Sequence, residues 1–104
     1  MAELTEVLAD ARAALADLLH SELAPKEWDR ALARARELRT WVEQRDAEHV
    51  AYLVGQIENG LARVATDLDS NQAATPVPQP VMDEINEMIH VVELQLLATK
   101  RRSG

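Results

Sequence analysis

Residues 81–102 read VMDEINEMIHVVELQLLATKRR, and this stretch decides the fold class. Its apolar residues recur at spacings of three and four, which is the pattern of an amphipathic helix. The main apolar stripe consists of Met82, Ile85, Ile89, Val92 and Leu96. At about 100° per residue, Val91, Leu94 and Leu97 lie on a different side of the same helix. A helix that is apolar on nearly all sides needs more protein surface around it to bury its apolar residues than a small bundle provides. We therefore predict that it contacts a partner.

Three further helices are predicted upstream from the same spacing. The first spans about residues 4–20, and its stripe consists of Leu4, Val7, Leu8, Ala11, Leu15, Leu18 and Leu19. The second begins at Pro25, which suits a first helical turn, and its stripe consists of Trp28, Ala31, Leu32, Ala35, Leu38 and Val42. The third follows Asp46 as its N-cap, and its stripe consists of Val50, Leu53, Val54, Ile57, Leu61, Val64 and Leu68. Gly60 marks a point where this helix could kink or end early.

The stretch 69–80, DSNQAATPVPQP, contains three prolines and no periodicity, so we expect an extended linker. The predicted organisation of residues 1–104 is a single all-α domain, a four-helix bundle. Its parts are a three-helix core (1–68), the linker (69–80) and a partner-facing C-terminal helix (81–102). Short links predict that the first three helices are antiparallel neighbours, whereas the long linker lets the fourth cross the bundle or leave it.

Composition narrows the class of protein. With 104 residues and 47% apolar residues, the chain is long enough for one domain with its own core. A net charge of −7 argues against a nucleic-acid binder, which needs a basic surface. No long uncharged apolar run and no signal-peptide pattern occur, so we expect no membrane insertion. The absence of cysteine fits a cytoplasmic location.

The three histidines raise the question of a metal site. Each follows a carboxylate by three positions, in the pairs Asp17–His20, Asp46–His49 and Glu87–His90. Carboxylate-bridged di-iron bundles use Glu-x-x-His at this spacing, but they need two such pairs and two further glutamates. Only Glu87–His90 contains Glu, and Glu87 falls nearly opposite the apolar stripe of its helix. We therefore predict no metal and no cofactor.

Catalysis by a nucleophile is not predicted either. The serines occupy a helix end, the linker and the C-terminus, namely Ser21, Ser70 and Ser103. None lies in a Gly-flanked turn, and three glycines form no phosphate-binding loop. We expect a protein without enzymatic activity.

Binding surfaces are better supported by the pattern. One side of the second helix carries Arg30, Arg34, Trp41 and Arg45. Trp and Arg often contribute most to interface energy, although Trp41 could equally cover the edge of the core while the arginines extend over it. On the last helix, Val91, Leu94 and Leu97 predict a partner or a homodimer contact, against the alternative of a helix well buried in a compact bundle.

Two segments resemble a known family. They are residues 8–19, with Ala11, Arg12, Leu15, Leu18 and Leu19 in an ARxxLxxLL pattern, and residues 23–28, LAPKEW. With Pro80, Val81, Asn86 and His90 in a PVxxxxNxxxH pattern, they resemble the CATRA-associated small proteins. Those are short helical proteins of bacterial conflict systems, encoded beside a larger protein in which a CATRA domain is fused to a caspase-like or trypsin-like protease.

The resemblance implies an accessory or adaptor subunit of a defence complex that binds the larger effector and has no catalysis of its own. Carried over to this chain, the positions of interest are Trp28, Pro80, Val81, Asn86 and His90. The alternative function is a self-associating scaffold, an antitoxin or a phage-type inhibitor that presents the acidic face of the first helix.

Overall fold

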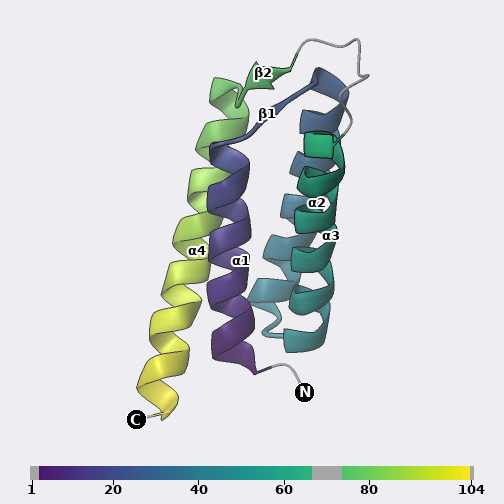
Figure 1. The fold of residues 1–104 in the computed structure, drawn as a ribbon. Helices are drawn as coiled ribbons and strands as arrows, with labels where there is room; N and C mark the ends of the chain where they lie inside the picture. The colour runs from purple at the N-terminus through teal and green to yellow at the C-terminus, as the bar shows by residue number, and fades with distance from the viewer. Residues whose placement is uncertain (1–2, 67–73, 104) are drawn as a thin grey trace.

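The computed structural model describes residues 3–66 and 74–103 and consists of an up-and-down set of helices (Figure 1). The helices are α1 (Leu4–Leu19), α2 (Pro25–Glu43), α3 (Ala47–Thr66) and α4 (Gln79–Ser103). Two strands of two residues each, β1 (Glu22–Leu23) and β2 (Thr75–Pro76), pair at one end of the bundle. The predicted all-α four-helix bundle is confirmed. Within the described part of the chain, no helix combines the length and apolarity needed to cross a membrane.

The order of the helices around the bundle differs from the expected one. α1 packs against α3 and α4, and α2 packs against the same two helices, so that α1 and α2 face each other across the diagonal (Figure 1). A short link makes α2 and α3 antiparallel neighbours, as predicted. α1 and α2 are also antiparallel, but the prediction that they are neighbours is wrong, because β1 carries the chain across the end of the bundle before α2 begins (Figure 1).

The core is formed by the predicted stripes. The first three helices bury Leu8, Leu15, Leu18, Trp28, Leu38, Val42, Val50 and Ile57. In α4, Ile85, Val92 and Leu96 are buried as predicted, but Met88 completes the stripe and Met82 and Ile89 are only half-buried. The buried face of α4 is therefore rotated slightly from the predicted one.

The helix boundaries follow the predicted capping residues. α2 begins at Pro25, and Asp46 caps α3 because its Oδ1 accepts the backbone N–H of His49 at 3.2 Å. α3 continues through Gly60 to Thr66, so the glycine does not end it. The side chain of Val64 and the whole of Leu68, both predicted for this stripe, lie outside the described residues.

Part of the predicted linker is a strand. β2 pairs antiparallel with β1, with Glu22 opposite Pro76 and Leu23 opposite Thr75. The buried indole of Trp28 donates its N–H to the Thr75 carbonyl at 3.0 Å, which fixes the strand to the start of α2. α4 then begins at Gln79, inside the predicted linker, whereas residues 67–73 of that linker lie outside the described part.

Candidate docking surfaces

The outward face of α4 carries two large exposed apolar residues. Leu94 and Leu97 have 52% and 55% of their surface exposed. They belong to a row of exposed residues with alternating spacings of four and three, which we call the outer stripe: Asp83, Glu87, His90, Leu94, Leu97 and Arg101. Val91, which was grouped with the two leucines, is half-buried and packs against the core. The outer stripe is apolar at its centre, acidic at one end and basic at the other.

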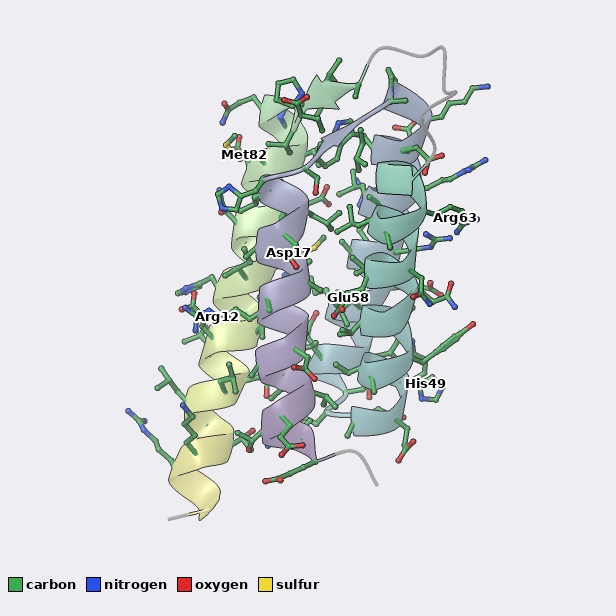
Figure 2. The ribbon with its side chains drawn as sticks, viewed as in Figure 1. Arg12, Asp17, His49, Glu58, Arg63 and Met82 are labelled. Carbon is green, nitrogen blue, oxygen red and sulfur yellow. The ribbon has the colours of Figure 1, made fainter. Side chains whose placement is uncertain are left out.

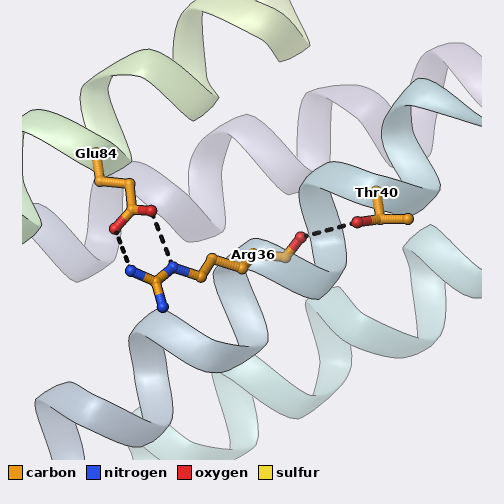
Figure 3. Close-up of polar contacts among 3 residues, drawn as sticks. All are labelled: Arg36, Thr40 and Glu84. Carbon is orange, nitrogen blue, oxygen red and sulfur yellow. Dashed lines mark hydrogen bonds and ion pairs between the residues drawn. The ribbon is translucent and has the colours of Figure 1, made fainter.

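Ion pairs fix α4 to the bundle on either side of the outer stripe. The guanidinium of Arg36 in α2 donates from Nε and Nη2 to the two carboxylate oxygens of Glu84, at 2.9 and 3.0 Å (Figure 3). These hydrogen bonds and the attraction between the charges raise the pKa of Arg36 and lower the pKa of Glu84. Arg12 in α1 approaches Glu93 to 3.8 Å. The fourth helix thus packs on α1 and α2 and does not leave the bundle.

Arg45 does not belong to the predicted Arg–Trp surface. It follows the last turn of α2 with φ at 58°, and the N–H of the next residue, Asp46, bonds to the carbonyl of Trp41. In this left-handed conformation its side chain reaches α4, where Nη1 donates to Gln95 Oε1 at 2.6 Å and Nη2 donates to Thr99 Oγ1 at 2.8 Å. The expectation that it shares a side with Trp41 is wrong, because helical angles do not extend beyond the end of a helix.

A groove between α2 and α3 contains the aromatic residues. The indole of Trp41 stacks on the imidazole of His49, with ring centroids 4.0 Å apart and planes inclined by 12°. His49 lies at the outer surface of α3 (Figure 2), and its Nδ1 is 2.8 Å from Asp46 Oδ2. We call this feature the α2–α3 groove; it encloses about 290 Å³ and is lined by Arg34, Glu37, Trp41, His49, Tyr52 and Gln56, beside Leu53 at its base.

The two arginines predicted beside Trp41 differ in their contacts. Arg30 forms an ion pair with Glu27 at 3.1 Å, one helical turn earlier. Arg34 is half-buried and forms neither a hydrogen bond nor an ion pair with any residue in 3–66 or 74–103. Its guanidinium lies over Gly60 of α3, where an added Cβ would be only 3.0 Å from Nη1. Among the described residues, Arg34 thus lines the groove with a guanidinium that has no ion-pair partner.

The carboxylate–histidine pairs do not converge. Across residues 3–66 and 74–103, no three His, Asp or Glu side chains gather in a way that could hold a metal ion. His90 is exposed on α4, beside a shallow depression of about 410 Å³ that Arg39, Asp83 and Glu87 also line. Asp46 and His49 are in contact, and hydrogen bonds from the backbone N–H and the ring of His49 lower the pKa of Asp46.

The positions drawn from the family resemblance lie in different environments. Trp28 is buried with 2% of its surface exposed, so its role in this chain is to pack and to bond strand β2. Pro80 lies in the first turn of α4, Val81 is half-buried, and Asn86 and His90 are exposed farther along the helix. Comparison of the chain with protein-family models, curated proteins and solved structures finds no match.

Proposed function

We propose that this protein is a non-catalytic accessory subunit that binds a larger protein through the outer stripe of α4. The observation that carries the proposal is the exposure of Leu94 and Leu97, 52% and 55%, side by side on a helix whose other large apolar residues are buried or half-buried. Adjacent exposed leucines with a charged border are typical of an interface centre surrounded by a polar rim.

The proposed partner follows from the resemblance to CATRA-associated small proteins. It is a CATRA-domain effector encoded nearby, and any proteolytic activity of the complex belongs to the effector. The complex is proposed to act in a bacterial defence system in the cytoplasm. His90 lies within the outer stripe, so the residue matched to the family pattern and the exposed leucines share one surface.

A second candidate is self-association through the same helix. The outer stripe begins with Asp83 and Glu87 and ends with Arg101. Two copies of α4 packed antiparallel would place the acidic end of each stripe beside the basic end of the other, around a centre of leucines. This charge pattern is the specific observation that favours a homodimer.

Measuring the absolute mass of the purified chain over a wide concentration range, with and without the neighbouring effector, distinguishes the candidates. A monomer that forms a complex only with the effector supports the accessory subunit. A dimer that forms without the effector and ignores its addition supports self-association. A chain that stays monomeric under both conditions contradicts both proposals.

Leu94→Asp tests the surface itself. Because Leu94 is half exposed, we expect Leu94→Asp to lower the free energy of unfolding by about 1–1.5 kcal/mol, through lost partial burial and helix propensity, and to leave the monomer folded while association weakens at least about tenfold. Ala33→Asp, which adds the same charge at an exposed position of α2, is the matched control and should leave association intact. Loss of the folded monomer in Leu94→Asp, or equal weakening by both variants, would contradict the assignment.

A further inference from the structure

We propose that the α2–α3 groove is a separate binding site for a short peptide segment carrying one carboxylate and, about three residues away, an aromatic or large aliphatic side chain. The groove and the outer stripe lie on different sides of the bundle, since α3 and α4 do not pack against each other as neighbours (Figure 1). The inference therefore does not depend on the proposed α4 partner.

Arg34 is the reason for placing a carboxylate on the ligand. Among the described residues this half-buried guanidinium has no hydrogen bond or ion pair, whereas Arg30, one turn earlier, pairs with Glu27. A guanidinium presents paired N–H donors that match a carboxylate in geometry and charge. The absence of a side chain at Gly60 leaves the space in which the Arg34 guanidinium lies against α3. The cation is thus positioned at one end of the groove and available to an incoming acid.

The aromatic residues at the other end of the groove are the reason for placing an apolar side chain on the ligand. Trp41 and His49 form a stacked pair, and Asp46 holds the imidazole by accepting its Nδ1–H in the tautomer that places the proton there. Tyr52, with 58% of its surface exposed, stands one turn farther along α3. Three rings grouped around an open groove offer apolar area with little loss of side-chain entropy on binding.

The separation of the two ends sets the spacing of the ligand. The Arg34 guanidinium lies over Gly60, which is eight residues from Tyr52 in α3, or about 12 Å along the helix axis at 1.5 Å per residue. An extended peptide covers about 10 Å in three residues at roughly 3.3 Å each. Because the side chains of the ligand add to this reach, a carboxylate three positions from an aromatic residue would contact Arg34 and Tyr52 together.

The electrostatics favour a singly charged peptide over a polyphosphate or a nucleotide. Glu37 lines the groove between Arg34 and Trp41, and its carboxylate would repel a second negative charge on the ligand. The chain as a whole has a net charge of −7, which opposes a multiply charged anion. Of the described residues that line the groove, Arg34 alone contributes a guanidinium without an ion pair, which matches one carboxylate.

The two tryptophan indoles provide a direct assay on the intact chain. In ¹⁵N-labelled protein, the indole N–H of Trp41 reports on the groove, while that of Trp28, buried and bonded to Thr75, reports on the fold. The probe is the blocked peptide acetyl-Phe-Ala-Ala-Asp-amide, with its reversed sequence as a second probe because the groove does not fix the chain direction. The peptide with Asn in place of Asp is the neutral control.

We expect the acidic peptide to shift the Trp41 resonance and leave the Trp28 resonance in place. The Asn peptide should bind at least about fivefold more weakly. Arg34→Gln should reduce binding of the acidic peptide to that of the neutral one and leave the neutral peptide unaffected, whereas Arg30→Gln should change neither. An unmoved Trp28 resonance in Arg34→Gln shows that the variant remains folded.

Three outcomes would overturn the proposal. The first is that neither peptide shifts the Trp41 resonance at concentrations up to about 10 mM. The second is that the Asp and Asn peptides bind equally well. The third is that Arg34→Gln and Arg30→Gln weaken binding of the acidic peptide by the same factor. A Trp41 shift produced by AMP but by neither peptide would reassign the groove to a nucleotide. Because the α4 partner is absent from the assay, none of these results bears on the accessory-subunit proposal.

Discussion

Substitution of Arg45, at the end of α2, separates two opposing contributions to the free energy of unfolding: side-chain hydrogen bonds that stabilise the fold and a backbone conformation that destabilises it. Its backbone adopts φ of 58°, a conformation that favours glycine at the residue following a helix. Its side chain donates hydrogen bonds to Gln95 and Thr99 of α4. Arg45→Ala removes the hydrogen bonds and keeps the backbone strain, whereas Arg45→Gly removes both.

The structure sets the size of each contribution. The left-handed conformation costs a non-glycine residue about 1 kcal/mol. Each hydrogen bond from the half-buried guanidinium to a neutral oxygen contributes about 1 kcal/mol. The Thr99 hydroxyl still donates to the Gln95 carbonyl at 2.8 Å without Arg45, so no buried group is left unpaired. We expect Arg45→Ala to lower the free energy of unfolding by about 2 kcal/mol and Arg45→Gly by about 1 kcal/mol.

Urea and thermal unfolding followed by far-ultraviolet circular dichroism test this order. A gap of about 1 kcal/mol corresponds to a difference of about 4–8 °C in Tm for a domain of this size, with the glycine variant the more stable of the two. In a double-mutant cycle with Thr99→Val, the coupling to Arg45 should be about 1 kcal/mol. If the glycine variant is no more stable than the alanine variant, the left-handed backbone of Arg45 does not destabilise the protein. If the glycine variant is more stable than the wild type, the hydrogen bonds of Arg45 do not stabilise it.

Three further predictions concern other parts of the bundle. Hydrogen bonds in the folded protein lower the pKa of Asp46 from its ordinary value of 3.8. The stability that this carboxylate adds is therefore present above pH 3.8 and is lost as the pH falls through the lower pKa of the folded protein. The urea midpoint of Asp46→Asn should decline less than that of the wild type between about pH 5 and pH 2. Trp28→Phe removes the indole donor to strand β2, so we expect a loss of about 1–2 kcal/mol and faster amide exchange in residues 74–78, measured by mass spectrometry. Gly55→Ala and Gly60→Ala should each raise the free energy of unfolding by about 0.5–1 kcal/mol. Only Gly60→Ala should weaken binding of the acidic peptide in the indole assay, because its Cβ would meet the Arg34 guanidinium.

The sequence predicted the helices because their signals are local. Pro25 and Asp46 mark the starts of α2 and α3, and the apolar residues of each helix recur with the helical period. Met88 was missed in α4 because the neighbouring Ile89 is also apolar, and periodicity alone could not decide which of the two points into the bundle. The choice depends on the packing against α1 and α2.

The strand pair and the diagonal placement of α1 and α2 could not be predicted from local patterns. Strands of two residues have no detectable alternation, and β1 pairs with a segment more than fifty positions away, with Leu23 opposite Thr75. That pairing depends on a hydrogen bond from the buried Trp28, whose side chain the sequence assigned only to the apolar stripe. The signal was an aromatic residue with a polar N–H at a core position, where a partner is required.

The groove combines residues that the sequence analysis treated separately. Trp41 was assigned to a binding surface, Asp46 to a cap and His49 to a carboxylate–histidine pair, although the short turn between α2 and α3 brings all three together. Arg45 was placed on the wrong side because it lies in that turn. The prediction of Asp46 as an N-cap already implied that Arg45 is outside the helix, so its direction could not follow from helical angles.

The division of roles along α4 allows its binding surface to be tested independently of its fold. Of its 25 residues, Ile85, Met88, Val92, Leu96 and Thr99 face the bundle and are buried. Glu84 and Glu93 pair with α2 and α1, so the charges nearest the core are already used to hold the helix. Leu94 and Leu97 are about half exposed and lie outside the core, so replacing them leaves the core contacts and both ion pairs in place. A loss of association in these variants, with the monomer still folded, would therefore place the interface on the outer stripe, because the contacts that hold α4 to the bundle are unchanged.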